Sequence, residues 1–195
     1  MRITGGEWAG QRLGVPRGAV RPTSDRVRES VFAILGDLEG ARVLDLCAGS
    51  GALGLEALSR GAERAVFVDR SGPAVAQVRE NAATVGAADR VATVRADVLV
   101  AVERAEDRGE VFDLVLLDPP YAAGLADPVL AVLGGAGALA PHARVVVETD
   151  RRHPPGEPEG LRRTRERRYG DTLVTFYVST ATPRGPRREE SIRHE

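Results

Sequence analysis

Short apolar runs alternate with segments of helical periodicity through the middle of the chain, and this alternation constrains the fold more than any other feature. The runs are almost continuously apolar, as in Val115-Leu116-Leu117, which is typical of parallel strands buried on both faces. Because right-handed crossovers place helices on both sides of such a sheet, the pattern predicts a doubly wound α/β fold. Strands are expected at 43–47, 65–68, 91–94, 112–117 and 144–148, and helices at about 52–60, 71–86, 97–107 and 125–138.

The two ends of the chain differ from this repeating centre. Residues 1–20 are rich in Gly and Arg and predict a small hairpin or irregular arm. A helix is expected to start at Thr23 or Ser24, since either side chain can cap it and Asp25 suits its positive end. We therefore expect an N-terminal arm at 1–22, one main domain at 23–182 that ends in an antiparallel strand pair at 162–168 and 172–179, and a disordered tail at 183–195.

The first expected strand leads into a glycine-rich turn, Gly49-Ser50-Gly51-Ala52-Leu53-Gly54, which opens the next helix. Glycines at this spacing allow a tight turn and let the backbone approach a ligand closely. By itself the pattern is shared by dinucleotides and other nucleoside cofactors, and it also occurs as a purely structural turn. The turn alone therefore indicates a candidate cofactor site without identifying the cofactor.

Three carboxylates at the expected carboxyl edge of the sheet narrow the choice of cofactor. Asp69 ends the second strand, where a carboxylate can bind two ribose hydroxyls. Asp97 follows the third strand, near the expected adenine, although a helix N-cap is an equally ordinary role for it. Asp45 would repel a pyrophosphate but attract a ligand with an ammonium and a sulfonium. S-adenosylmethionine carries both groups, so the acids favour methyl transfer over hydride transfer.

Asp118-Pro119-Pro120-Tyr121 follows the fourth expected strand. The two prolines have fixed φ and lack an N–H, so they hold the Pro119 carbonyl stiffly as an acceptor. Together with the Asp118 carboxylate, this carbonyl can accept both hydrogens of an exocyclic amine and aim the nitrogen lone pair at a methyl group. Tyr121 can stack on the face of a base. An ordinary proline-rich turn remains the alternative.

Charge is distributed unevenly along a chain whose net charge is only -1. Residues 1–30 carry six Arg against three acidic residues, and residues 151–170 carry seven Arg against three Glu. Residues 97–150, by contrast, carry ten acidic residues and three Arg. The two basic ends are suited to hold a polyanion, and solvated surface charge is the less favoured alternative.

The rest of the composition excludes several classes of chemistry. The chain has no Lys, so no mechanism with a catalytic lysine applies, and its single Cys47 cannot form an intrachain disulfide. Cys47 is expected to be a buried, inert thiol. His142, His153 and His194 are scattered, so no metal site is expected. With no signal peptide and no membrane-length apolar run, we expect a cytoplasmic protein.

These motifs together resemble class I S-adenosylmethionine-dependent methyltransferases that act on amino groups. More narrowly, the sequence is similar to the 16S rRNA (guanine(966)-N(2))-methyltransferase family over about residues 1–180. The glycine turn and the Asp-Pro-Pro-Tyr motif are shared by many methyltransferases, whereas the arginine-rich segment at 21–29 is more specific to this family. The resemblance is carried by residues 2–6, 21–29, 45–61 and 118–121.

The resemblance implies a Rossmann-like sheet of seven strands with the last one antiparallel, and S-adenosyl-L-methionine as the cofactor. It implies methylation of guanine N2 in 16S rRNA, within the 30S subunit or an assembly intermediate, by a monomer. The catalytic residues would be Asp118, Pro119, Pro120 and Tyr121. The cofactor would contact Asp45, Ala48, Gly49, Ser50, Gly51, Asp69, Arg70, Asp97 and Val98, and RNA would contact Arg2, Arg12, Arg21, Thr23, Arg26 and Arg28.

Four alternative functions share part of this pattern. An NAD-dependent oxidoreductase has a similar glycine turn but is opposed by Asp45, by the Asp-Pro-Pro-Tyr motif and by the absence of Lys. A methyltransferase acting on DNA adenine or cytosine uses a similar tetrapeptide but is disfavoured, because this short chain has no evident base-reading domain. A protein glutamine methyltransferase usually has Asn before Pro-Pro. A non-catalytic RNA-binding module would tolerate loss of the acids, yet all of them are present.

Overall fold

The computed structural model describes residues 1–16, 24–120, 124–135 and 137–180. Within these residues the strands form one seven-stranded sheet in the order β3-β2-β1-β4-β5-β7-β6. The strands are Arg42–Leu46 (β1), Arg64–Asp69 (β2), Val91–Arg95 (β3), Phe112–Leu117 (β4), Leu139–Asp150 (β5), Leu161–Tyr169 (β6) and Thr172–Ser179 (β7).

Strand direction follows the expected class I pattern. Strands β3, β2, β1, β4 and β5 are parallel, and β7 runs antiparallel to both of its neighbours, β5 and β6. Strands β4 and β7 occupy the predicted residues, whereas β5 is much longer than the predicted 144–148. The added length pairs with β7 at one end and, across a register shift, with Phe112 of β4 at the other. The prediction of a seven-stranded sheet with an antiparallel last strand is confirmed.

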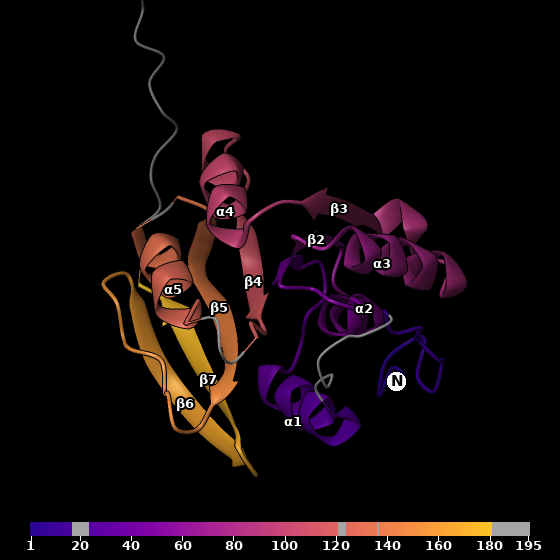
Figure 1. Ribbon diagram of the computed structural model, residues 1–195, viewed down its shortest axis with the longest axis horizontal. Coiled ribbons are helices and arrows are strands. Elements are labelled where there is room, and N and C mark those ends of the chain that lie inside the picture. Colours follow the sequence, from indigo (N-terminus) through magenta and orange to yellow (C-terminus); the bar gives the residue numbers. More distant parts are fainter. Residues whose placement is uncertain (17–23, 121–123, 136, 181–195) are drawn as a thin grey trace, which may run out of the picture.

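Helices cover both faces of this sheet (Figure 1). Buried side chains of α1, α2 and α3 form one core cluster on one face, and those of α4 and α5 form a second cluster on the other. Central strand residues such as Val43, Leu114 and Val145 are fully buried, which explains their continuously apolar sequence. The helices are Asp25–Leu35 (α1), Ala52–Ser59 (α2), Gly72–Thr84 (α3), Val98–Asp107 (α4) and Ala126–Gly135 (α5), with a short 3-10 helix at Ala88–Arg90.

The N-terminal segment, residues 1–16, packs against the α1–α3 face of the sheet. An antiparallel bridge joins Arg2 to Arg12, as expected for a small hairpin. Ile3, Trp8 and Leu13 are buried in the same core cluster as the helices. The segment is therefore part of the hydrophobic core, and its conformation depends on the helices beneath it.

Helix α1 starts where the sequence predicts. Ser24 is its N-cap, and the Ser24 side chain accepts a hydrogen bond from the Val27 amide. Thr23, the other candidate cap, lies outside the described residues, as do 17–22 and the predicted tail at 183–195. The helix ends at Gly36, whose φ of 69° lies in the left-handed region that glycine adopts without strain.

Candidate active site at the carboxyl edge of the sheet

The glycine turn and the Asp118 turn lie next to each other because their strands are neighbours. Parallel pairing sets Leu46 at the end of β1 opposite Leu117 at the end of β4. The Asp118 amide then donates to the Leu46 carbonyl at 3.4 Å, so the two turns leave the sheet side by side. Ligands of open α/β sheets bind at this edge, and two motifs 64 positions apart in the chain therefore share one site.

The turn after β1 has the backbone geometry of a ligand cradle. Gly49 and Gly51 have φ values of 55° and 78°, and a Cβ at Gly51 would lie 3.1 Å from the Val78 side chain. Cys47 also has a positive φ, 62°, which is strained for a non-glycine residue. The Gly51 amide donates to the Ala48 carbonyl at 2.7 Å and closes the turn. Strained backbone of this kind gathers at binding sites.

Asp45 is almost completely buried beneath this turn, with 1% of its surface exposed. Its Oδ2 accepts a hydrogen bond from the Gly54 amide at 2.9 Å. Burial raises the pKa of Asp45 well above its usual range, and the neighbouring Asp118 and Asp69 carboxylates raise it further. The strand thus places a poorly solvated carboxylate where a cationic ligand would relieve the repulsion.

Asp69 orients the same turn from the end of β2. Its Oδ2 accepts from the Gly49 amide at 2.9 Å, and its Oδ1 accepts from the Ser71 amide at 2.8 Å. Asp69 is half-buried and lies next to the turn. Its neighbour Arg70 is exposed.

Asp97 and Val98 lie at the start of α4. The Asp97 side chain caps the helix by accepting a hydrogen bond from the Leu99 amide at 2.9 Å. The N-cap role considered for Asp97 from the sequence is therefore present. Asp97 is exposed, whereas Val98 is buried in the core.

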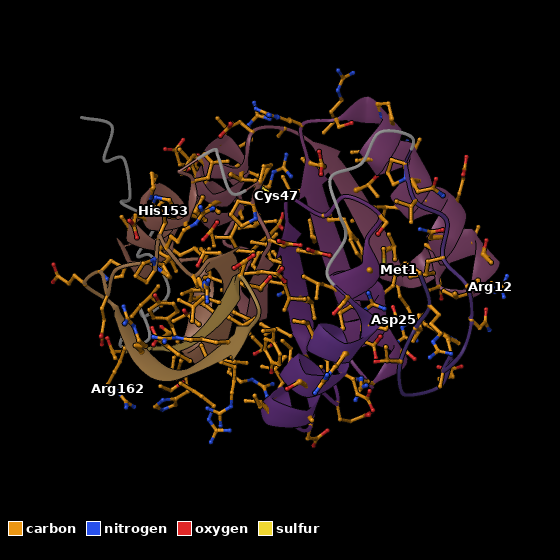
Figure 2. The ribbon with its side chains drawn as sticks, turned by 60° about the horizontal axis from the view of Figure 1, so that its bottom comes forward. Met1, Arg12, Asp25, Cys47, His153 and Arg162 are labelled. Carbon is orange, nitrogen blue, oxygen red and sulfur yellow. The ribbon has the colours of Figure 1, made fainter. Side chains whose placement is uncertain are left out.

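Cys47 lies one residue beyond β1, near the middle of the molecule (Figure 2). It is half-buried rather than buried, since the strand ends at Leu46 and Cys47 belongs to the turn. Burial raises the pKa of the Cys47 thiol to about 12, and Asp69, Asp118 and Asp45 add to the effect. A thiol that stays protonated is a weak nucleophile, which fits the inert role expected from the sequence.

Asp118, half-buried, begins the turn after β4, with Pro119 buried and Pro120 exposed behind it. Tyr121, the fourth residue of the motif, lies outside the described residues. Pro119 and Pro120 line a cavity of about 100 Å³ whose opposite wall comes from the end of β5 and the loop after it. That wall includes Thr149, Asp150, His153, Pro154 and Pro155.

Thr149 gives this cavity an unused hydrogen-bonding group. The residue is only 6% exposed, and its Oγ1 has no hydrogen-bond partner among the described residues. A buried hydroxyl without a partner costs about 1–3 kcal/mol, so a ligand that bonds to Thr149 would recover that energy. Asp150 is held differently, because Arg152 contacts both of its carboxylate oxygens and keeps its pKa below the usual range.

The predicted RNA-binding arginines divide into two groups. Arg2, Arg12 and Arg26 are exposed, and Arg2 also forms an ion pair with Asp25 at 3.2 Å. Arg28, in contrast, is fully buried. Since a buried guanidinium cannot contact RNA, the assignment of Arg28 to the RNA surface is wrong. Arg21 and Thr23, the remaining two candidates, lie outside the described residues.

Arg28 belongs to a buried ion-pair network that the sequence did not reveal. Its guanidinium contacts Asp25 at 2.8 Å and the fully buried Glu56 of α2 at 3.8 Å, and it donates to the Arg2 carbonyl. Glu56 also accepts from the amide and hydroxyl of Thr4, at 2.8 and 2.7 Å. The network therefore ties the N-terminal segment and α1 to α2.

Asn81 is a second residue that sequence reasoning missed. It is 3% exposed, and its side-chain amide donates to the carbonyls of Gly14 and Ser50 at 2.9 and 2.8 Å. Its carbonyl accepts from the Gly14 amide at 2.7 Å. Asn81 thus links the N-terminal segment to the glycine turn, where Ser50 is buried. A lone Asn in a helical pattern carries no signal of such a link.

Within the described parts of the chain, no group of three or more His, Cys, Asp or Glu side chains could hold a metal ion. No helix there has the length and apolar composition of a membrane span.

This strand order, with a glycine cradle and an Asp-Pro-Pro turn at one sheet edge, defines a class I methyltransferase. The model of the family described as "Conserved hypothetical protein 95" matches residues 1–178. The chain belongs to that family.

Relatives and a solved structure agree with this assignment. "Putative rRNA methyltransferase YlbH" of Bacillus subtilis is 38% identical over 180 residues, covering 91% of this chain and 98% of the relative. "Ribosomal RNA small subunit methyltransferase D" of Escherichia coli is 39% identical over 153 residues, covering 77% and 75%. The structure of "Putative methyltransferase yhhF" from E. coli has a TM-score of 0.81 at 34% identity and covers 93% of this chain and 99% of its own.

The comparisons confirm three of the predictions made from sequence: the family, the class I methyltransferase fold and the S-adenosylmethionine cofactor of this family. The residues at the sheet edge fit that cofactor. The turn is open at Gly49, where a Cβ would meet only the Cys47 carbonyl oxygen at 4.0 Å. The Asp45 carboxylate lies buried beneath the turn and lacks a basic partner among its described hydrogen bonds. A ligand with positively charged sulfur and nitrogen matches that environment.

Proposed function

We propose that the protein methylates the exocyclic N2 amine of a guanine in 16S rRNA, using S-adenosylmethionine. The observation that carries this proposal is the contact between the two turns, in which the Asp118 amide bonds to the Leu46 carbonyl. The contact supports the proposal because it keeps the Asp118 turn beside the glycine turn. The relatives named above as rRNA methyltransferases supply the class of substrate.

The cofactor half of the site would hold its ligand through backbone and carboxylates. The turn at 48–51 would take the amino acid end, next to Asp45, and the half-buried Asp69 would accept from the ribose hydroxyls. Asp97 would lie near the adenine, using the carboxylate oxygen that does not cap α4. When bound, the cofactor supplies a methyl group on a positively charged sulfur, which becomes a neutral thioether as the methyl leaves.

The substrate half of the site would act on the amine by positioning. The Asp118 carboxylate and the Pro119 carbonyl would each accept one hydrogen of N2, which turns the nitrogen lone pair toward the methyl group. The nitrogen gains a positive charge as its bond to carbon forms, and the Asp118 carboxylate stabilises that charge. A proton then leaves the nitrogen readily, so no strong base is needed.

The cavity beside Pro119 and Pro120 is the proposed site of the guanine ring. The prolines that line the cavity offer flat apolar surfaces, and the Thr149 hydroxyl, which also lines it, offers one hydrogen bond. The ring must leave its stack in the RNA to reach this depth, which costs a few kcal/mol. Tyr121, as the next residue of the motif, would stack on the base.

The test is methylation of 16S RNA, as free RNA and in 30S particles, followed by mass-spectrometric mapping. A methyl group on one guanine N2, transferred from labelled S-adenosylmethionine, is the expected result. Comparing methylation of free 16S RNA with methylation of 30S particles identifies whether the enzyme acts before or after assembly of the subunit. Methylation only of DNA or of a protein glutamine would refute the proposal while leaving the methyltransferase class intact.

A further inference from the structure

Strand β6 carries a concentration of charge that neither the proposed chemistry nor the cofactor explains. Its nine residues include five Arg and one Glu, in a chain with a net charge of -1. The strand lies at the end of the sheet, bonded only to β7. It therefore presents its arginines along a free edge, where Arg162 is labelled (Figure 2).

Only one of these arginines forms an ion pair among the described residues. Arg163 pairs with Glu166 at 3.0 Å, donates to the Pro155 carbonyl at 2.6 Å and lies over the Tyr177 ring. The other four, Arg162, Arg165, Arg167 and Arg168, are exposed and form no ion pair among the described residues. Exposed guanidinium groups without carboxylate partners, distributed over both faces of one edge strand, are suited to bind nucleic acid phosphates.

The sheet register brings one member of this set, Arg168, to the face of the candidate active site. Arg168 pairs with Leu173 of β7, and Leu173 pairs with Thr149 of β5. Residues paired directly across strands lie on the same face, so Arg168 lies on the face that holds the cavity. Two interstrand spacings separate the backbones of Arg168 and Thr149, a distance of roughly 10 Å. A nucleotide in the cavity would thus have its neighbours within reach of Arg168.

The same strand also meets the arginine-bearing surface of α1. Tyr169, which follows Arg168, contacts the hydroxyl of Ser30 through its own hydroxyl. Arg26 lies four positions before Ser30 and thus on the same side of α1. Arg167 lies two positions before Tyr169 and shares its face of β6, which is the face opposite Arg168. The Ser30–Tyr169 contact therefore joins two basic surfaces that are about 140 positions apart in sequence.

We propose that the exposed arginines of β6, together with Arg26, form a second RNA-binding surface that holds the phosphates flanking the target nucleotide. This proposal deepens the proposed function, on which it rests for the identity of the RNA. Charged side chains on an edge strand also prevent pairing with another sheet. That role, however, requires no continuity with α1 and no alignment with the cavity, and both are present here.

The test uses the full chain with Arg165, Arg167 and Arg168 changed together to Gln. A matched control changes Arg64, Arg104 and Arg108 to Gln, because these exposed arginines lie on β2 and at α4 and not on β6. Binding of 16S RNA is measured over a series of salt concentrations, beside S-adenosylmethionine affinity. We expect the β6 variant to bind at least tenfold more weakly and to lose about two units of salt slope, with cofactor affinity unchanged.

A further variant separates RNA binding from edge protection. Changing the same three arginines to Lys keeps the charge and should retain most of the RNA affinity and salt slope. Equal RNA binding by the β6 and control Gln variants would overturn the inference, even when wild-type protein methylates 16S RNA normally. If instead wild-type protein binds 16S RNA with the expected salt slope but transfers no methyl group, the proposed function fails and the RNA-binding surface stands.

Discussion

The two halves of the sheet differ in whether their polar side chains are paired within the protein. On the β1–β3 side, Arg28, Glu56 and Asn81 are buried and bonded to other parts of the protein. On the β5–β7 side, Arg165 and Arg168 are exposed without ion-pair partners, and Thr149 has a buried hydroxyl without a hydrogen-bond partner, among the described residues. Figure 2 shows the two halves apart, with Met1, Arg12 and Asp25 on one side and His153 and Arg162 on the other.

This difference fits the proposed function, in which the β1–β3 half binds the cofactor and the β5–β7 half binds the RNA substrate. A small ligand of fixed shape is bound best by a site whose geometry is set in advance, because little ordering remains to be done on binding. Buried hydrogen bonds fix the conformation of the N-terminal segment and of the glycine turn in this way. They come from Glu56 and from Asn81. A flexible polyanion instead needs unpaired donors at the surface, which the β6 side provides.

The largest expected effect is on stability and comes from Arg28→Ala. Removing this guanidinium leaves Glu56 buried without one of its partners, and breaking a buried ion pair typically costs about 3–5 kcal/mol. Urea unfolding followed by circular dichroism measures the loss. Arg26→Ala is the matched control two residues away, and because Arg26 is exposed its cost should stay within about 0.5 kcal/mol. Similar stability of the two variants would contradict the structural assignment of Arg28.

Asp118→Ala tests the boundary between the two halves. Loss of one preorganised group at the reacting nitrogen is expected to lower the rate constant of methyl transfer by about 10²–10³-fold. Cofactor affinity, measured by calorimetry, should change by no more than a few-fold, since Asp118 belongs to the turn after β4. Activity close to wild type would remove Asp118 from the mechanism, and a matching loss of cofactor affinity would move it to the cofactor half.

Asp45→Asn tests the cofactor half, through the pH dependence of stability and through cofactor affinity. Because burial raises the pKa of Asp45 in the folded protein, its protonated form stabilises the fold, and this contribution is lost as pH rises through the folded pKa. The amide does not titrate, so the variant should be more stable than wild type at neutral pH, by about 1–3 kcal/mol. The advantage should vanish in acid, while cofactor affinity at neutral pH falls about tenfold. Melting temperatures across pH, with calorimetry, measure both effects.

The sequence predicted the parts of this molecule that depend on local pattern. Strand β4, the Ser24 cap and the turns at Gly49 and Asp118 were located because periodicity and turn chemistry act within a few residues. The burial of Arg28 was not predicted, since its partner Glu56 is 28 positions away and an arginine run looks the same whether it faces water or a carboxylate.

The substrate half was predicted least well, for a related physical reason. Thr149 lies inside β5, whose full length depends on pairing with β4 and β7 rather than on its own pattern. The alignment of Arg168 with Thr149 follows from the register of three strands. Such alignments are properties of the assembled sheet, so no single segment of sequence contains them.

The smallest expected effect compares two threonines of the same sheet. Thr149 and Thr175 are both buried, and neither hydroxyl has a hydrogen-bond partner among the described residues. Only Thr149 lines the cavity beside Pro119. Since valine removes an unsatisfied hydroxyl without changing the shape of the side chain, both Thr149→Val and Thr175→Val should leave the free energy of unfolding unchanged or raise it by about 1 kcal/mol.

Their effects on methylation should differ. Thr149→Val is expected to lower kcat/KM for RNA by about fivefold, the loss of one hydrogen bond of about 1 kcal/mol, whereas Thr175→Val should leave it unchanged. Single-turnover methylation with 16S RNA provides the measurement. Equal kcat/KM in the two variants would mean that the Thr149 hydroxyl bonds to no substrate, and the cavity would then lose its proposed role as the guanine site. A difference in the expected direction would show that the β5–β7 half keeps this hydroxyl unsatisfied for the RNA.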